Sequence, residues 1–237
     1  MLRPVVRSTA VLAALACVTV GACTAQAQTR VRVGVLAGAN MSTLTDLAGD
    51  YADQSGLEAK YRAGFQGGVF AQIPVSGRFS LQPEVHYAQK GAKFEGTFTG
   101  DMQSDLGVSL KLAYVDVPIL ARIDLGNAAR LHPFLVLGPS VSIRTGCTVG
   151  LSLGGANLDT KCSDGGDGTG ESFDPVKKSD ISGIAGLGLA TSWMGRTVSV
   201  QARVTQSLRS IANDDTAGGS PVSPKNRGVT VVFGLTR

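Results

Sequence analysis

Glu84, His86 and Lys90 lie close together in the segment LQPEVHYAQKGAKF, residues 81–94, at intervals of two and four residues. A carboxylate, an imidazole and an amine in one short segment are typical of general acid–base sites and of metal sites. They are equally typical of the polar face of a β-strand, because side chains two residues apart on a strand point to the same side. The surrounding segments show whether these residues form an active or metal site or only the polar face of a strand.

A second pattern that could form an active site is GLSLG at residues 150–154, which matches the G-x-S-x-G motif of serine hydrolases. The motif works only as a sharp strand-to-helix turn in an α/β sheet, with Asp and His partners supplied elsewhere. Here it is expected in a glycine-rich loop between two cysteines. We therefore expect no nucleophile and no catalytic residue.

Acidic residues and histidines could also bind a metal ion. The segment DTKCSDGGDGTGESFD, residues 159–174, carries five acidic side chains, but their spacing does not fit a calcium-binding EF-hand loop. His86 and His132, the only two histidines, lack cysteines or clustered carboxylates at ligand spacing. We expect a solvated acidic loop, no metal site and no cofactor.

The first residues predict a secretory signal peptide. Arg3 and Arg7 precede an apolar run from about residue 10 to 22, which is short for a membrane span. Residues 25–27, Ala-Gln-Ala, offer cleavage after Ala27, so that a single mature domain spans residues 28–237. The alternative is a lipobox at VGAC with lipidation of Cys23.

Charge and cysteine content fit an extracytoplasmic protein. Loss of the leader removes two arginines and leaves 20 basic against 18 acidic side chains, which gives no reason to expect a nucleic-acid partner. Cys147 and Cys162 are then the two remaining cysteines, and a pair in an oxidising compartment predicts a disulfide.

Alternation of apolar and polar residues with a period of two marks eight strands. Odd-numbered positions are apolar in most of them, as in Val31, Val33 and Val35 or Val115, Val117 and Ile119, whereas the parity reverses around Val198 and Val200. The runs lie at about residues 31–41, 65–73, 79–90, 115–124, 132–144, 182–193, 198–205 and 229–236.

Strands of 11 to 14 residues suit a bilayer, which a tilted strand crosses in about 9 to 11 residues. Long connections at residues 42–60, 91–109, 145–179 and 209–226 alternate with tight ones at 76–77, 126–130 and 194–195. This alternation is typical of an up-and-down barrel whose tight turns face the periplasm. An open sheet in lipid would leave edge amides unpaired, so the sequence predicts an all-β, eight-stranded antiparallel transmembrane β-barrel in the outer membrane of a Gram-negative-type envelope.

In such a barrel the polar positions face a lumen that eight strands leave just wide enough for side chains. Buried charges require partners. We expect a plug of paired side chains in which Glu84 and Asp116 bind Arg122, Arg203 or Lys90, with His86 hydrogen-bonded beside them. The full predicted lumen network is Glu84, His86, Lys90, Asp116, Arg122 and Arg203.

Three successive segments carry a family resemblance: FSLQPEVHYAQKGAKF, LAYVDVPILARIDL and HPFLVLGPSVSI. Together they resemble the consecutive central strands of the PorT-like outer-membrane β-barrel domain family, and the likeness extends to RVGVLAGANMSTL and AGFQGGVFAQIPVSGRF before them. The resemblance implies an eight-stranded outer-membrane barrel without shared catalytic residues. The chain ends in VVFGLTR rather than in the terminal aromatic residue that many such barrels present to the insertion machinery, so either Phe233 or a less typical signal is expected to serve instead.

These observations favour a non-enzymatic envelope protein with a structural or surface-interaction role. Its expected partners are outer-membrane lipid, the barrel-insertion machinery during assembly, and an extracellular partner bound through residues 145–179, where a disulfide would restrain a glycine-rich loop. A narrow porin for small solutes is the alternative, and a lipid-modifying outer-membrane enzyme is the third. A lipocalin-like ligand barrel is disfavoured because the polar set of positions carries too many charges for an apolar ligand.

Overall fold

We describe the protein from a computed structural model, which describes residues 30–45, 58–98, 104–126, 131–153, 156–162, 176–211 and 224–237. The expected leader at residues 1–27 lies outside these ranges, as do the acidic residues of the 145–179 segment beyond Cys162 and before Val176. Within the described ranges, no helix has the length and apolar character needed to cross a membrane.

Nine antiparallel strands make up the fold. They are β1 (Arg32–Thr45), β2 (Glu58–Ser76), β3 (Phe79–Phe98), β4 (Ser104–Asp124), β5 (His132–Leu153), β6 (Ala156–Lys161), β7 (Ser179–Trp193), β8 (Arg196–Ser207) and β9 (Lys225–Thr236). Eight of them close into a barrel, because β1 pairs with β9 and β4 pairs with β5. Every strand edge in the wall is thereby paired, as a lipid environment requires. The predicted eight-stranded barrel is confirmed, and β6 is an addition that pairs with β5 alone among the described residues.

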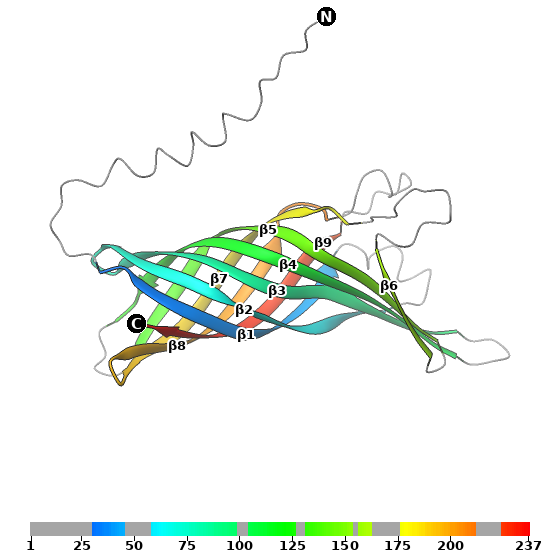
Figure 1. Ribbon diagram of the computed structural model, residues 1–237, viewed down its shortest axis with the longest axis horizontal. Helices are drawn as coiled ribbons and strands as arrows, with labels where there is room; N and C mark the ends of the chain where they lie inside the picture. The colour runs from blue at the N-terminus through cyan, green and yellow to red at the C-terminus, as the bar shows by residue number, and fades with distance from the viewer. Residues whose placement is uncertain are drawn as a thin grey trace, which may run out of the picture.

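Both chain ends of the barrel, Arg32 on β1 and Arg237 after β9, lie at the same end as the tight turns (Figure 1). The turn between β7 and β8 is closed by Met194 and Gly195, which both have positive φ (49° and 73°). Two such residues make the turn whose twist matches a right-twisted hairpin. Because tight turns face the periplasm in outer-membrane barrels, we assign this end to the periplasmic side.

The side-chain pattern of the wall follows the predicted parity. Large apolar side chains face outward and remain exposed, among them Val35, Phe65, Val117, Leu137 and Leu187. Polar side chains of the alternate positions are buried in the lumen, and on β8 the reversed parity places Ser199, Gln201 and Arg203 inside. The barrel is therefore apolar toward lipid and polar within.

The lengths of four strands differ from the prediction. β2 to β5 contain 19, 20, 21 and 22 residues, whereas the other four wall strands contain 12 to 15. Much of the expected loops 91–109 and 145–179 is thus strand. The alternation continues weakly through these extensions, for example in Leu106, Val108 and Leu110, but the glycines and polar residues between them led to their assignment as loops.

These extensions leave the barrel on the side opposite the tight turns and form a sheet that projects from it (Figure 1). Pairing of β1 with β2 ends at Ser42 and Arg62, and pairing of β5 with β7 ends at Ile143 and Ser179. Beyond those residue pairs, the described residues of β2, β3, β4, β5 and β6 pair with one another, apart from the Arg144 N–H, which donates to the Lys178 carbonyl at 2.8 Å. We call residues 58–61, 91–98, 104–113, 144–153 and 156–161 the projecting sheet.

Gly91 lies where the projecting sheet leaves the barrel. It has φ +140°, and a Cβ there would lie 1.9 Å from the carbonyl oxygen of Leu110. The Ser42 hydroxyl bonds both its N–H (2.9 Å) and its C=O (3.0 Å), and the β2–β3 register shifts nearby, between Tyr61 and Gln66. Glycine is required at this bend.

We therefore expect Gly91→Ala to loosen the projecting sheet from the barrel. The substitution forces both a backbone clash and a disfavoured φ, so proteolysis of residues 91–113 should accelerate while the barrel keeps its heat-modifiable migration on gels. Gly107→Ala is the control, because its nearest neighbour would be 3.5 Å away. Equal protease resistance of both variants would contradict this role for Gly91.

Candidate functional site

The centre of the lumen holds a buried ion pair between β3 and β8. Glu84 and Arg203 form two hydrogen bonds of 2.7 and 2.8 Å, and each residue is only 2% exposed. Gln82 donates to Glu84 at 2.7 Å, and Gln201 accepts from Arg203 at 2.7 and 3.0 Å. The fork-to-fork geometry with neutral amides on both sides satisfies the charges without water.

A second ion pair lies next to the first, between β3 and β4. The Lys90 ammonium is 2.9 Å from Asp116 and donates to Ser142 at 3.3 Å. His86 stands between the two pairs, with Nε2 3.4 Å from Asp116 and Nδ1 3.6 Å from Glu84. Five of the six residues proposed from the sequence thus form one connected cluster, Glu84, His86, Lys90, Asp116 and Arg203, which we call the lumen cluster.

Arg122 does not join the lumen cluster. It lies nearer the periplasmic end, where it donates to Asp124 at 3.0 and 3.1 Å and stacks 3.6 Å from the centre of the Phe134 ring. Of the three cations that the sequence offered to Glu84 and Asp116, the structure pairs Arg203 with Glu84 and Lys90 with Asp116, and Arg122 with neither. Asp124 lies two residues along the same strand, and therefore on the same face, which makes it the nearer carboxylate.

A buried carboxylate that sequence reasoning missed is Asp180 on β7, which is 2% exposed. It accepts hydrogen bonds from the Ser207 hydroxyl and from the Asn226 amide. Its parity matches that of Ser182, an inward position of the same strand, so the alternation already contained the signal.

Two apolar layers enclose the charged centre of the lumen. On the periplasmic side, Phe70 and Phe134 fill the interior where glycines stand opposite: a Cβ at Gly34 would lie 2.7 Å from Phe70, and one at Gly188 would lie 2.4 Å from Phe134. Toward the other end is a buried cluster of Leu44, Ala92, Leu112, Tyr114, Val176 and Ile211. Inward-facing phenylalanines break the expected polar parity, and the inward glycines on neighbouring strands are the feature that makes room for them.

Val176 and Ile211 come from chain outside the barrel strands and close the outer mouth. The Lys177 N–H donates to the Ile211 carbonyl at 2.7 Å, and the Ile211 N–H donates to Pro224 at 2.8 Å. A cavity of 30 Å³ between this layer and the lumen cluster is lined by residues including Asn40, His86 and Asn226. That volume holds about two water molecules.

The projecting sheet presents a different surface, exposed on the extracellular side. It carries two cross-strand ion pairs, Lys60–Glu95 at 2.6 Å and Lys111–Asp159 at 2.8 Å. A hydrogen bond from Lys60 holds the pKa of the exposed Glu95 carboxyl below its usual range. β6 is exposed along its whole length, and its Leu158 is paired directly with the exposed Leu151 of β5.

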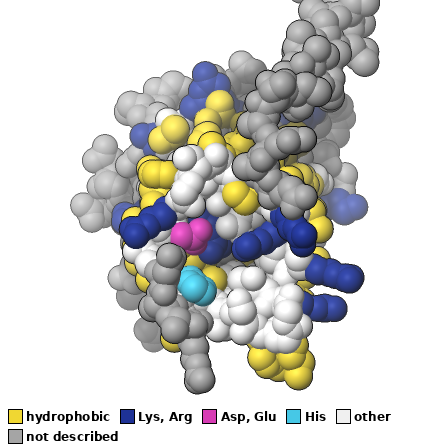
Figure 2. Space-filling view, turned by 90° about the vertical axis from the view of Figure 1, so that its left-hand side faces the viewer, with side chains coloured by type: hydrophobic (Ala, Val, Ile, Leu, Met, Phe, Trp, Pro, Cys, Tyr) yellow, Lys and Arg dark blue, Asp and Glu magenta, His cyan; other side chains and the backbone are white. Residues whose placement is uncertain are grey.

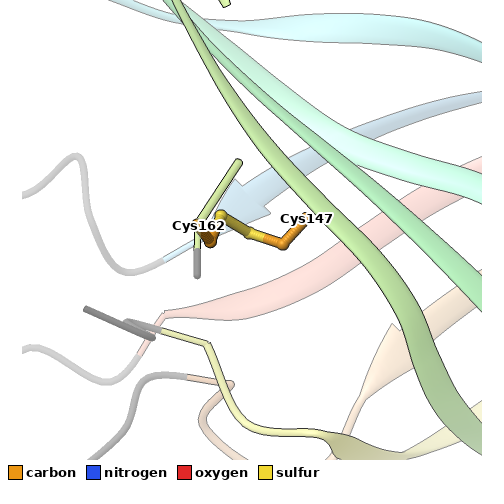
Figure 3. Close-up of a disulfide and its surroundings, with 2 residues drawn as sticks. All are labelled: Cys147 and Cys162. Atoms are coloured by element: carbon orange, nitrogen blue, oxygen red, sulfur yellow. A yellow bond between two sulfur atoms is a disulfide. The ribbon is translucent and has the colours of Figure 1, made fainter. Parts of the chain in front are cut away.

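The disulfide predicted between Cys147 and Cys162 is present, with a Cα–Cα distance of 5.4 Å (Figure 3). It joins β5 to the end of β6, and the Cys162 N–H also donates to the Cys147 carbonyl at 3.2 Å. Its position differs from the prediction in one respect: it links two paired strands of the projecting sheet and does not restrain a loop.

We expect the double variant Cys147→Ser, Cys162→Ser to weaken the β5–β6 hairpin and to leave the barrel intact. Closing a segment of about 15 residues stabilises by about 3 kcal/mol in the chain-entropy model. Proteolysis within residues 148–161 should accelerate, whereas heat-modifiable migration of the barrel should not change. Mass spectrometry of unreduced wild-type protein should show the two peptides linked; two free thiols in protein taken from the outer membrane would contradict this.

The hydrolase-like GLSLG motif and the two histidines lie far apart and form no site. Ser152 of the GLSLG segment is in the extended strand β5, paired with Asn157, and not in the loop that the sequence suggested. His86 lies level with Ser142, so about ten residues of strand, roughly 33 Å, separate it from Ser152. His132 is farther still, at the start of β5. Within the described ranges, no three His, Cys, Asp or Glu residues are grouped as a metal site would require.

The family model described as outer membrane protein beta-barrel domain matches residues 25–213. The chain belongs to this family. Together with a closed barrel that is apolar on its outer wall, the match places the protein in the outer membrane. None of the curated proteins matches the sequence.

Three solved structures are similar in fold to this outer-membrane barrel. Neisserial surface protein A is 11% identical, with TM-score 0.43, over 86% of this chain and 96% of that chain. OprG from Pseudomonas aeruginosa is 13% identical, with TM-score 0.42, over 88% and 97%. Ail, the attachment invasion locus protein of Yersinia pestis, in complex with the heparin analogue sucrose octasulfate, is 11% identical, with TM-score 0.38, over 88% and 99%.

Proposed function

We propose that this outer-membrane barrel is a non-conducting, non-enzymatic scaffold that presents its projecting sheet to a partner outside the cell. The observation that carries the proposal is that β2 to β5 continue beyond the last residue pairs that β2 forms with β1 and β5 forms with β7. The Cys147–Cys162 disulfide cross-links this extended part. A strand needs no more than about 11 residues to cross the bilayer. The additional residues therefore serve something outside the membrane.

The mode of recognition that fits this surface is strand addition at β6. Its six residues are all exposed, and the sheet order ends with it. An edge strand offers a row of backbone donors and acceptors to an extended segment of a partner, and exposed side chains such as Leu158 add side-chain contacts. Loops and edges on a rigid scaffold are where recognition usually resides.

The sealed lumen supports a non-conducting scaffold over the alternative of a narrow porin. A solute would have to displace the outer layer around Leu112 and Ile211, the paired charges of the lumen cluster, and Phe70 with Phe134. Each layer is closed by packed or hydrogen-bonded side chains. The distance of Ser152 from both histidines argues against the lipid-modifying enzyme.

We also propose that the chain belongs to the PorT-like branch of its family. The support is the order of its central motifs on consecutive strands: LQPEVHYAQKGA on β3, YVDVPIL on β4 and HPFLVLGPS on β5. Assembly by the barrel-insertion machinery, with Phe233 near the end of β9 as an outward aromatic, is part of the same proposal.

The proposal is tested by deleting residues 148–161 and comparing cells that display the deletion with cells that display the wild type. Adhesion to immobilised proteins and polysaccharides should fall, because the hairpin that carries β6 is gone, while heat-modifiable migration should persist. Asn157→Pro is the finer variant, since it removes one backbone N–H from the edge strand β6. Unchanged adhesion after the deletion would move the interaction surface elsewhere.

A lysine-labelling experiment tests presentation without knowledge of the partner. A membrane-impermeant amine reagent applied to whole cells should label the exposed Lys161 of β6 and spare Lys90, whose side chain is 12% exposed and paired with Asp116 inside the lumen. Labelling confined to permeabilised cells would show that the projecting sheet does not face outward.

A further inference from the structure

The periplasmic end of the barrel carries a concentration of exposed arginines. They are Arg30, Arg32, Arg78, Arg196 and Arg237. Figure 2 shows this end directly, with basic side chains spread around it and acidic colour among them. None of the lysines in the described ranges lies here. We call these five residues the arginine rim.

Strand pairing places the members of the rim next to one another. Arg196 begins β8, and the following Thr197 pairs with Thr236, the neighbour of Arg237. The Arg237 N–H donates to the Val33 carbonyl, next to Arg32 on β1. Arg78 lies in the turn between β2 and β3. The arc thus runs without interruption across the ends of β8, β9, β1, β2 and β3.

Nearby acidic side chains do not neutralise this arc. Asp124 is the acidic side chain at this end among the described residues, and it already accepts two hydrogen bonds from Arg122. The rim is therefore positively charged. Guanidinium groups bind phosphate in a planar, two-pronged geometry that lysine cannot reproduce.

An apolar groove lies on the outer wall against two of the rim arginines. Its volume is 720 Å³, and its lining includes outward-facing side chains of five neighbouring strands, β4, β3, β2, β1 and β9, together with Arg196 and Arg237. The apolar members include Val33, Val35, Val69, Val85, Val117 and Leu235. This part of the wall faces lipid, so the groove opens toward acyl chains.

We propose that the groove and the rim together bind one anionic phospholipid of the periplasmic leaflet. Arg196 and Arg237 bind its phosphate, and the groove takes an acyl chain. Charge complementarity selects the occupant: a second copy of the chain would bring a second positive rim to this face, whereas an anionic headgroup offsets the charge already there. The site lies at the end opposite the projecting sheet, so its failure would leave the proposed surface role untouched.

The molecule carries its own reporter for this site. Trp193 is the only tryptophan of the chain, is 64% exposed, and pairs directly with Arg196 across the β7–β8 turn. Bromine atoms on lipid acyl chains quench tryptophan fluorescence at close range. Quenching of Trp193 therefore reports which lipid occupies the neighbourhood of Arg196.

The experiment uses the full barrel refolded in phosphatidylcholine vesicles with one fifth of the lipid replaced by brominated phosphatidylglycerol or, separately, by brominated phosphatidylcholine. We expect the wild type to prefer phosphatidylglycerol by roughly 25-fold, since each of the two arginines near the membrane surface contributes on the order of fivefold. In Arg196→Gln, Arg237→Gln the preference should fall to within about twofold of unity. Equal quenching of the wild type by both lipids would overturn the proposal.

Two control variants separate a built site from general attraction. Lys161→Gln, Lys178→Gln removes the same charge from the extracellular end and should leave the preference unchanged. Ala71→Phe places bulk in the groove without altering charge, because Ala71 lines it, and should lower the preference. A preference that survives Ala71→Phe in full, or one that falls equally in the lysine variant, would show diffuse electrostatic attraction and contradict the groove site.

Discussion

Replacing Arg203 by alanine is expected to lower the free energy of unfolding of the barrel by about 3 to 5 kcal/mol. The substitution leaves Glu84 charged and buried at the centre of the lumen, with Gln82 donating to it at 2.7 Å and His86 3.6 Å away in place of the guanidinium. An unpaired charge in a water-poor interior is costly because its hydration is not replaced. Urea unfolding of the protein in vesicles, monitored by the gel shift between folded and unfolded forms, measures the loss.

Two controls separate this effect from the loss of an ordinary ion pair. The double variant Glu84→Gln, Arg203→Met removes both charges and should recover much of the lost stability, since replacing both members of a buried pair is often nearly neutral. Lys111→Ala removes one member of the exposed pair with Asp159 and should cost about 1 kcal/mol or less. A loss in Arg203→Ala no larger than in Lys111→Ala would show that the lumen is wet.

A lysine at position 137 should destabilise the barrel by about 2 to 4 kcal/mol. Leu137 is 63% exposed, on the outer face of β5 and within the span that pairs with both β4 and β7. In water such an exposed leucine would accept a lysine at almost no cost. In lipid the charge has to be dehydrated or drawn toward the interface.

Leu158 offers a matched comparison for this substitution. It is 66% exposed, but it lies on β6 in the projecting sheet, outside the bilayer. Leu158→Lys should therefore change the unfolding free energy by no more than about 0.5 kcal/mol. Leu137→Phe should also be tolerated. Equal costs for lysine at positions 137 and 158 would mean that the two leucines share one environment and that the assigned lipid-facing wall is wrong.

The barrel was predictable because each membrane-spanning strand has an apolar face toward lipid and a polar face toward the lumen. Val115, Val117 and Ile119 face lipid while Asp116 faces the lumen, so period-two alternation in the sequence encoded both the strands and their sides. In the projecting sheet the alternation continues in Leu106, Val108 and Leu110 of β4 and in Cys147, Val149 and Leu151 of β5, but among glycines and polar residues that also suit a loop. Leu110 packs against the buried cluster around Leu112. Residues 156–161 are exposed along their length, and their strand is specified by pairing with β5, which the sequence does not reveal.

The sequence predicted which charged residues face the lumen, but only in part which of them pair with one another. Parity selected Glu84, Asp116 and Arg203 as inward residues, whereas the choice of partner depends on register across strands far apart in the sequence, such as β3 and β8. For that reason the sequence left Arg122, Arg203 and Lys90 as alternative partners of the two carboxylates. Phe70 and Phe134 were missed because their burial depends on glycines of other strands, a relation that no single strand displays.

A planar-bilayer recording of the refolded protein tests the central proposal most directly. We expect no steady single-channel current, because the outer apolar layer, the lumen cluster and the Phe70–Phe134 layer each close the lumen. Removing one layer in Arg203→Ala should leave the other two in place and the bilayer still without steady conductance. Steady currents of porin size from the wild-type protein would contradict the sealed lumen and favour a pore for small solutes.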